Sequence, residues 1–156
     1  MGDTIFHDHA RKPRNVGLLE NANVVIQAGN PECSDKLVFF IRIDNDVVQD
    51  IRFLIEGCET TVATSSVITE LVKGQPLDAV LALSDRSISD ALDGLPEEKM
   101  HCSAMAASAL HAAVRQYRNT AKGDASSAEH TVDDYRIVTQ VLNAPLADVY
   151  SAGYDL

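Results

Sequence analysis

Apolar side chains fall on one face of two neighbouring stretches in the first third of the chain. They are Leu37, Phe39, Ile41 and Ile43 within residues 36–44, and Val47, Ile51, Phe53 and Ile55 within residues 47–56. A period of two is typical of a strand with one buried face. Asp44-Asn45-Asp46 joins the two stretches, and Asn and Asp favour turns. The pattern predicts a half-buried antiparallel hairpin, with a further strand over residues 21–29.

After Cys58 the apolar spacing changes to the helical period of about 3.6 residues. This spacing predicts helices over 60–73, 76–83, 85–93 and from Ser103 to about Tyr117, with a short helix over 3–12 before Pro13. Strands followed by helices, without strand–helix–strand alternation, indicate an α+β fold. We expect a three-stranded antiparallel sheet with helices packed on one face.

The length of 156 residues suits one compact domain with a short appendage. We place the main domain at residues 1–120. The polar stretch "AKGDASSAEHT", residues 121–131, is interpreted as a linker. Weak helical patterning over 132–156 favours a helical C-terminal extension of unknown role.

Charge and hydropathy exclude several classes of function. The net charge is −10, and no basic cluster suited to binding phosphates is present, which argues against nucleic-acid binding. No apolar run approaches the roughly 20 residues that a membrane helix needs. The N-terminal stretch is too polar for a signal peptide, so we expect a cytoplasmic protein without a membrane partner.

The three cysteines lie in "PECSD", "EGCET" and "KMHCS", as Cys33, Cys58 and Cys102. Each is expected at the edge of an element, and two precede predicted helices, where the helix dipole stabilises a thiolate. Asp35 and His101 add a carboxylate and an imidazole beside them. Thiolates completed by such groups are the ligands of zinc and of iron–sulfur clusters.

The chemistry of the cysteines alone leaves alternatives open. No Cys-x-x-Cys pair is present, and an odd number of cysteines excludes a closed disulfide framework. The thiols could form one metal or cluster site, a structural zinc module, or unrelated buried positions. A thiol enzyme is a further alternative, with Cys102 or Cys58 as nucleophile and His101 as base.

Four ordered motifs carry a family resemblance. They are "DHARKPRNVG", "PECSD", "EGCETTVATSSVITELVKG" and "KMHCS", all within roughly residues 5–120. With them the chain resembles the IscU/NifU N-terminal family of iron–sulfur cluster assembly scaffolds. The resemblance implies that the protein is not an enzyme. It implies instead that a cysteine desulfurase delivers persulfide sulfur to a scaffold thiol, that iron and electrons enter, and that a transient [2Fe–2S] cluster is passed to apo-protein acceptors.

The resemblance also assigns roles to residues of this chain. It implies that Cys33, Cys58 and Cys102 are the cluster ligands, and that Asp35 shares the site and keeps the cluster labile. By the same comparison His101 is an additional or alternative fourth ligand, and Lys99 lies beside the site. Zinc is expected to fit the same ligands, and two chains could share one cluster as a homodimer.

One motif departs from the family pattern. Residues 95–99 read "LPEEK", where many family members have Leu-Pro-Pro-Val-Lys, the motif gripped by a dedicated Hsp70-type chaperone. Two carboxylates, Glu97 and Glu98, stand in place of Pro-Val. This difference argues against that chaperone as a partner.

Overall fold

The computed structural model describes residues 2–30, 35–121, 127–132 and 135–142. Helix α1 (Gly2–Arg11) precedes strands β1 (Val24–Asn30), β2 (Asp35–Asp44) and β3 (Val47–Glu56). Helices α2 (Glu59–Val72), α3 (Leu77–Leu81) and α4 (Asp85–Ala91), the 3₁₀ turn η1 (Glu97–Lys99) and the long helix α5 (Met100–Ala121) follow. Strands β4 (Ser127–Val132) and β5 (Tyr135–Val141) come last. The predicted α+β class is confirmed.

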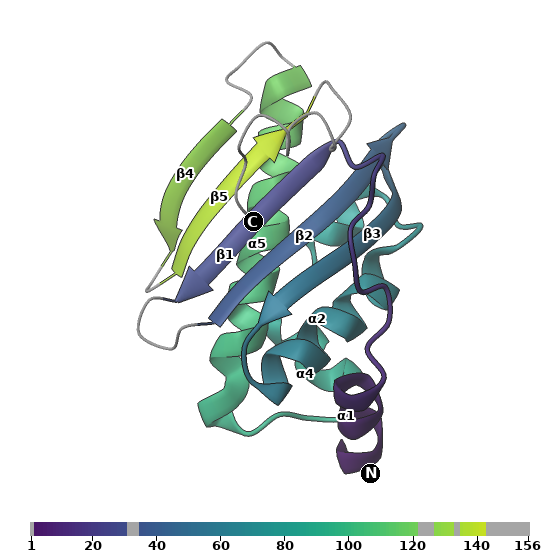
Figure 1. Ribbon diagram of the computed structural model, residues 1–156, viewed down its shortest axis with the longest axis vertical. Coiled ribbons are helices and arrows are strands. Elements are labelled where there is room, and N and C mark those ends of the chain that lie inside the picture. The colour runs from purple at the N-terminus through teal and green to yellow at the C-terminus, as the bar shows by residue number, and fades with distance from the viewer. Residues whose placement is uncertain (1, 31–34, 122–126, 133–134, 143–156) are drawn as a thin grey trace.

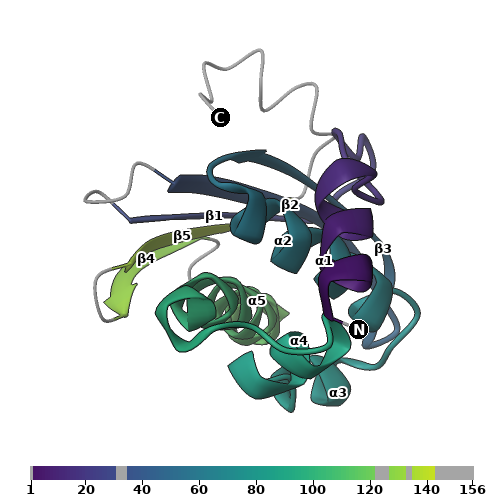
Figure 2. The ribbon, with the colours of Figure 1, turned by 90° about the horizontal axis from the view of Figure 1, so that it is seen from below.

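The strands form one antiparallel sheet in the order β3-β2-β1-β5-β4 (Figure 1). Its β1-β2-β3 part is the predicted three-stranded sheet. The helices gather on one side of it, with α5 lying along β1 and β5 and α2 against β3 (Figure 2). The arrangement of helices on one face is therefore as the sequence predicts.

The C-terminal region differs from the prediction. Residues 135–141 were expected to be helical, but they form β5, which pairs with β1 from Val24↔Val141 to Gly29↔Arg136. The predicted linker also ends in a strand, because β4 begins at Ser127 and pairs with β5. The sheet thus has five strands within the described residues, not three. The remainder of the predicted helical extension, residues 143–156, lies outside the described part.

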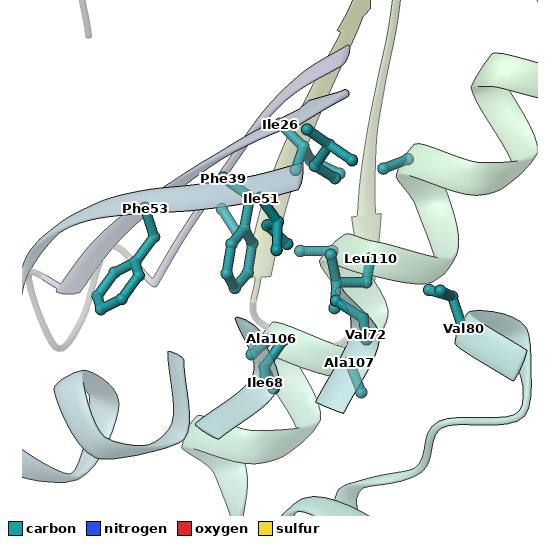
Figure 3. Close-up of a cluster of buried hydrophobic side chains, with 14 of the residues drawn as sticks. Ile26, Phe39, Ile51, Phe53, Ile68, Val72, Val80, Ala106, Ala107 and Leu110 are labelled. Atoms are coloured by element: carbon teal, nitrogen blue, oxygen red, sulfur yellow. The ribbon is translucent and has the colours of Figure 1, made fainter. Parts of the chain in front are cut away.

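The main core lies between the sheet and the helices (Figure 3). Phe39 and Phe53 are fully buried and their rings contact each other, with centroids 6.3 Å apart. Burying one such side chain stabilises a fold by about 1.5–3 kcal/mol. The other contributors labelled in Figure 3 are Ile26 and Ile51 of the sheet, Ile68 and Val72 of α2, Val80 of α3, and Ala106, Ala107 and Leu110 of α5.

A β-bulge shifts the pairing register of the hairpin formed by β2 and β3. Arg42 pairs with Asp50, but Ile43 pairs with Val48, so Gln49 is the extra residue. Because each added residue reverses the side of the sheet that a side chain faces, Val48 enters the core in place of the predicted Val47. The predicted turn is confirmed: Asn45 and Asp46 both have positive φ, as a tight hairpin turn requires.

The outer face of the sheet carries a second apolar cluster. Val25 and Phe40 are fully buried there, and Val38 is nearly so. Leu19 and Ala22, from the segment before β1, pack against them. The centre of the sheet is therefore buried on both faces, which the uninterrupted apolar run "LVFFI" in β2 reflects.

Helix α1 is held against α2 by polar contacts. His9 is buried, with Nδ1 2.7 Å from Ser66 Oγ and Nε2 3.3 Å from a carboxylate oxygen of Glu70. The backbone N–H of Arg14 donates to the same Ser66 hydroxyl at 2.9 Å. These contacts fix the start of the chain beside the helix that follows Cys58.

Candidate thiol site

Cys58 is the residue that joins the sheet to helix α2. It stands at the N-cap, with extended backbone angles of φ −76° and ψ 167°, as an N-cap requires. Its side chain forms no capping bond to the helix backbone and is exposed. Instead, its Sγ lies 3.3 Å from the Thr61 hydroxyl. The predicted position just before a helix is confirmed.

Cys102 enters the same place from the other long helix. It is the third residue of α5, which begins at Met100 and not at the predicted Ser103, so Cys102 lies within the first turn and not before it. Its side chain is fully buried. The Thr61 hydroxyl donates to Cys102 Sγ at 3.4 Å. One oxygen atom therefore contacts both sulfurs.

His101 completes the described part of the site. Its Nε2 lies 3.5 Å from Cys102 Sγ, and its Nδ1 lies 3.1 Å from the carbonyl oxygen of Glu98. A carbonyl only accepts hydrogen bonds, so Nδ1 carries a proton. In the neutral ring Nε2 then presents its lone pair towards the thiol. Such a backbone contact is how proteins orient a metal-binding histidine.

The strand register places Asp35 at the same end of the sheet as Cys58. Asp35 is the first residue of β2, and its neighbour Lys36 pairs with Glu56, two residues before Cys58. Asp35 itself pairs with Asn30 across β1 and β2. Cys33 falls within residues 31–34, outside the described part of the chain. The roles of Cys33 and of the Asp35 side chain stay predictions.

Lys99 ends the 3₁₀ turn that leads into α5. Its side chain is exposed, and its backbone N–H donates to the Pro96 carbonyl at 2.9 Å. Lys99 comes two residues before His101 in the chain. Its predicted role beside the site stays untested.

The described donors are a part of the predicted ligand set. Cys58 and Cys102 contact one hydroxyl at the N-termini of α2 and α5, and His101 Nε2 lies beside Cys102. At these positions the helix dipoles favour anionic sulfur. Among residues whose placement is described, no three Cys, His, Asp or Glu side chains are close enough together to hold a metal ion. A complete cage would need further ligands, and Cys33 and Asp35 are the predicted ones.

Comparison with known proteins places the chain in a family. The family model for the NifU-like N terminal domain matches residues 3–124. The chain belongs to this family. The iron-sulfur cluster assembly scaffold protein IscU of Aquifex aeolicus is 46% identical over 112 residues, which cover 70% of this chain and 71% of that protein. The protein of the same name from Escherichia coli is 37% identical over 116 residues, covering 72% of this chain and 90% of that protein.

Longer relatives match with the same part of the chain. The nitrogen fixation protein NifU of Azotobacter chroococcum is 42% identical over 71% of this chain, but the match covers only 37% of that protein. Among solved structures, the N-terminal part of a NifU-like protein from Brucella abortus matches with a TM-score of 0.56 at 18% identity. It covers 78% of this chain and 94% of that one. At this identity the likeness shows the fold alone.

No helix among the described residues is both long enough and apolar enough to span a membrane.

Proposed function

We propose that this protein is a scaffold, not an enzyme, on which iron–sulfur clusters are assembled before transfer to other proteins. The observation that carries the proposal is the convergence of Cys58 and Cys102 on one hydroxyl, with His101 Nε2 alongside. The identity to scaffold proteins named IscU supports the same role.

The cluster is the cargo of this site. Cys33, Cys58 and Cys102 supply thiolates to a [2Fe–2S] cluster, and Asp35 or His101 supplies the fourth ligand. The resulting cage is weaker than four thiolates, which suits a cluster that must leave again. Zinc accepts the same ligands, since thiolate and imidazole are its usual donors.

The partners follow from this role. A cysteine desulfurase delivers sulfur as a persulfide, an electron donor reduces it to sulfide, and apo-proteins that need an iron–sulfur cluster receive the product. Exposure of Cys58 leaves one thiol accessible to a sulfur donor, while Cys102 is buried. Two further expectations stay predictions from the sequence. One is a cytosolic location, and the other is a homodimer in which two chains share one cluster.

Anaerobic reconstitution tests the proposal. The full chain is incubated with ferrous iron, cysteine and a cysteine desulfurase, and cluster formation is followed by visible absorption. Transfer is then measured to an apo-ferredoxin. A cluster that forms and transfers is the expected result. Zinc that iron and sulfide never displace would instead identify a structural zinc module, and metal-independent turnover of a small substrate would identify a thiol enzyme.

A further inference from the structure

The Thr61 hydroxyl joins the two described cysteines of the site. Thr61 lies in the first turn of α2 and is fully buried. Its oxygen is 3.3 Å from Cys58 Sγ and 3.4 Å from Cys102 Sγ. The two sulfurs come from helices far apart in sequence, so this oxygen ties the start of α2 to the start of α5.

Two other threonines of α2, Thr64 and Thr69, use their hydroxyls differently. Thr64 donates to the carbonyl of Thr61 at 3.0 Å, and Thr69 donates to the carbonyl of Ser66 at 2.7 Å. Such a bond to the residue three positions earlier is the common way to satisfy a helical threonine. Thr61 directs its hydroxyl at the thiols instead.

A hydroxyl has one hydrogen, so its two sulfur contacts are not equivalent. Thr61 donates to Cys102, whereas in the contact with Cys58 either atom can be the donor. When both sulfurs have lost their protons to bind metal, only one can receive the Thr61 hydrogen. Of the two contacts, only the one with Cys102 has Thr61 as its defined donor.

We propose that Thr61 is a positioning residue of the cluster site, which holds Cys58 and Cys102 together and donates a hydrogen bond to the Cys102 ligand sulfur. This inference rests on the proposed scaffold function. Hydrogen bonds to ligand sulfurs help to set the reduction potential of a cluster, because they withdraw electron density from the sulfur. Groups behind the ligands also support metal affinity, and their loss typically costs about 10–100-fold.

The first test uses Co²⁺ as a spectroscopic probe of the full-length protein. Thiolate-to-cobalt absorption is titrated anaerobically in wild type, Thr61→Val and Thr61→Ser. Val keeps the shape of Thr without the hydroxyl, so we expect about a tenfold weaker affinity for Co²⁺. Ser keeps the hydroxyl and should restore most of the affinity. Thr64→Val is the matched control, because its hydroxyl bonds only a backbone carbonyl in the described contacts.

The second test measures the reduction potential of the reconstituted cluster. The Thr61→Val cluster should have a more negative potential than wild type, while Thr61→Ser and Thr64→Val stay close to wild type. If Thr61→Val does not fold, as judged by circular dichroism, Thr61→Ala replaces it, since Ala and Ser differ only by the oxygen atom.

The inference is overturned if the variants without the hydroxyl match Thr64→Val in both Co²⁺ affinity and potential. Failure of the scaffold function would give a different result, because wild type itself would then form no transferable cluster. The Co²⁺ comparison would still report on Thr61 in that case.

Discussion

His9 is a buried histidine whose surroundings oppose protonation. Burial lowers its pKa most, the positive charge of Arg14 lowers it further, and the carboxylates of Glu70 and Asp8 partly oppose the shift. Because Ser66 Oγ accepts from the Arg14 N–H, its own hydrogen is available to His9 Nδ1. The neutral ring then donates from Nε2 to Glu70. Protonation of Nδ1 would break this arrangement.

The stability of the fold should therefore decrease in mild acid. Unfolded histidine binds a proton near pH 6.5, whereas folded His9 resists it, so the unfolded state binds more protons below that pH. The free energy of unfolding should fall as the pH drops from about 6.5 towards the lowered pKa of His9. In His9→Asn, the amide can keep the Ser66 contact. The unfolding free energy of this variant should change less steeply with pH, because unfolding then takes up as much as one proton fewer.

Urea unfolding at several pH values between 8 and 5, a range of about three units around the histidine pKa, checks this expectation. His7→Asn is the control, because His7 is exposed on the same helix and should leave the profile of wild type unchanged. Equal pH dependence in wild type and His9→Asn would show that His9 does not carry the effect.

Asp35 is expected to control how readily the cluster leaves. A carboxylate is a hard ligand for iron, and in the fourth position Asp35 competes with the imidazole of His101. Without Asp35, His101 would hold that position alone. We expect Asp35→Ala to slow cluster loss and transfer by about tenfold, the lower end of what a change around the ligands produces. The rate of cluster transfer to apo-ferredoxin is the measurement that checks this expectation.

The control for this variant is Asp90→Ala, which removes an exposed carboxylate from α4. It should transfer its cluster at the rate of wild type. Equally fast transfer from Asp35→Ala would contradict a role for this carboxylate in cluster lability.

The sequence singles out the cysteines and His101 as candidates, but it does not single out Thr61. Cysteine and histidine beside predicted helix starts are rare enough to stand out. A threonine in "CETTVATSS" has the same appearance as its neighbours, and only the packing of α2 against α5 decides which hydroxyl reaches a sulfur. That packing depends on contacts more than forty residues apart in the chain, such as Thr61 with Cys102.

At the scale of elements, the C-terminal hairpin completes the sheet. The family match ends at residue 124, whereas β4 begins at Ser127 and β5 pairs along β1. Ile137 of β5 is fully buried in the main core. The hairpin therefore supplies both the neighbour of β1 and part of the hydrophobic interior.

Truncating Ile137 should destabilise the whole domain. Ile137→Ala removes a fully buried side chain, which typically costs about 2–5 kcal/mol. Val138→Ala, the half-exposed neighbour on the opposite face of β5, should cost roughly 1 kcal/mol. Equilibrium urea unfolding measures both. A cost for Ile137→Ala no larger than that for Val138→Ala would mean that the hairpin is peripheral to the core.

The sequence contains a strand signal in this region that competes with a helical one. "YRIVTQV" is rich in β-branched residues, and Ile137 and Thr139 alternate with Val138 and Gln140. Its apolar residues also fit helical spacing, and short runs of this kind are ambiguous by periodicity alone. Pairing with the open edge of β1, a partner more than 100 residues earlier, settles the choice.

At the scale of the whole molecule, the acidic surface should influence the choice of partners. The net charge is −10, and Glu97 and Glu98 add two exposed carboxylates to the turn that leads into the thiol site. An apolar groove that accepts Pro-Val would have to bury both charges. Burying unpaired carboxylates is costly, so such a chaperone should bind this chain weakly.

Replacing both glutamates should create the missing chaperone site. In the double variant Glu97→Pro/Glu98→Val, the turn would read Leu-Pro-Pro-Val-Lys. Pro96 already has φ −58° and ψ 149°, the conformation preferred before a proline, so the change should not disturb the fold. Burial of one valine stabilises a complex by about 1.5–3 kcal/mol, which corresponds to about tenfold or more in affinity.

The measurement is stimulation of the ATPase of an Hsp70-type chaperone that recognises Leu-Pro-Pro-Val-Lys. Wild type should stimulate it weakly, and the double variant at least about ten times more strongly at equal concentration. Glu97→Gln/Glu98→Gln removes the charges without adding apolar surface, so it separates the cost of the carboxylates from the gain of Pro-Val. Wild type could instead stimulate the ATPase as strongly as Glu97→Pro/Glu98→Val does. That result would show that the chaperone binds another part of this molecule, and that "LPEEK" does not exclude it.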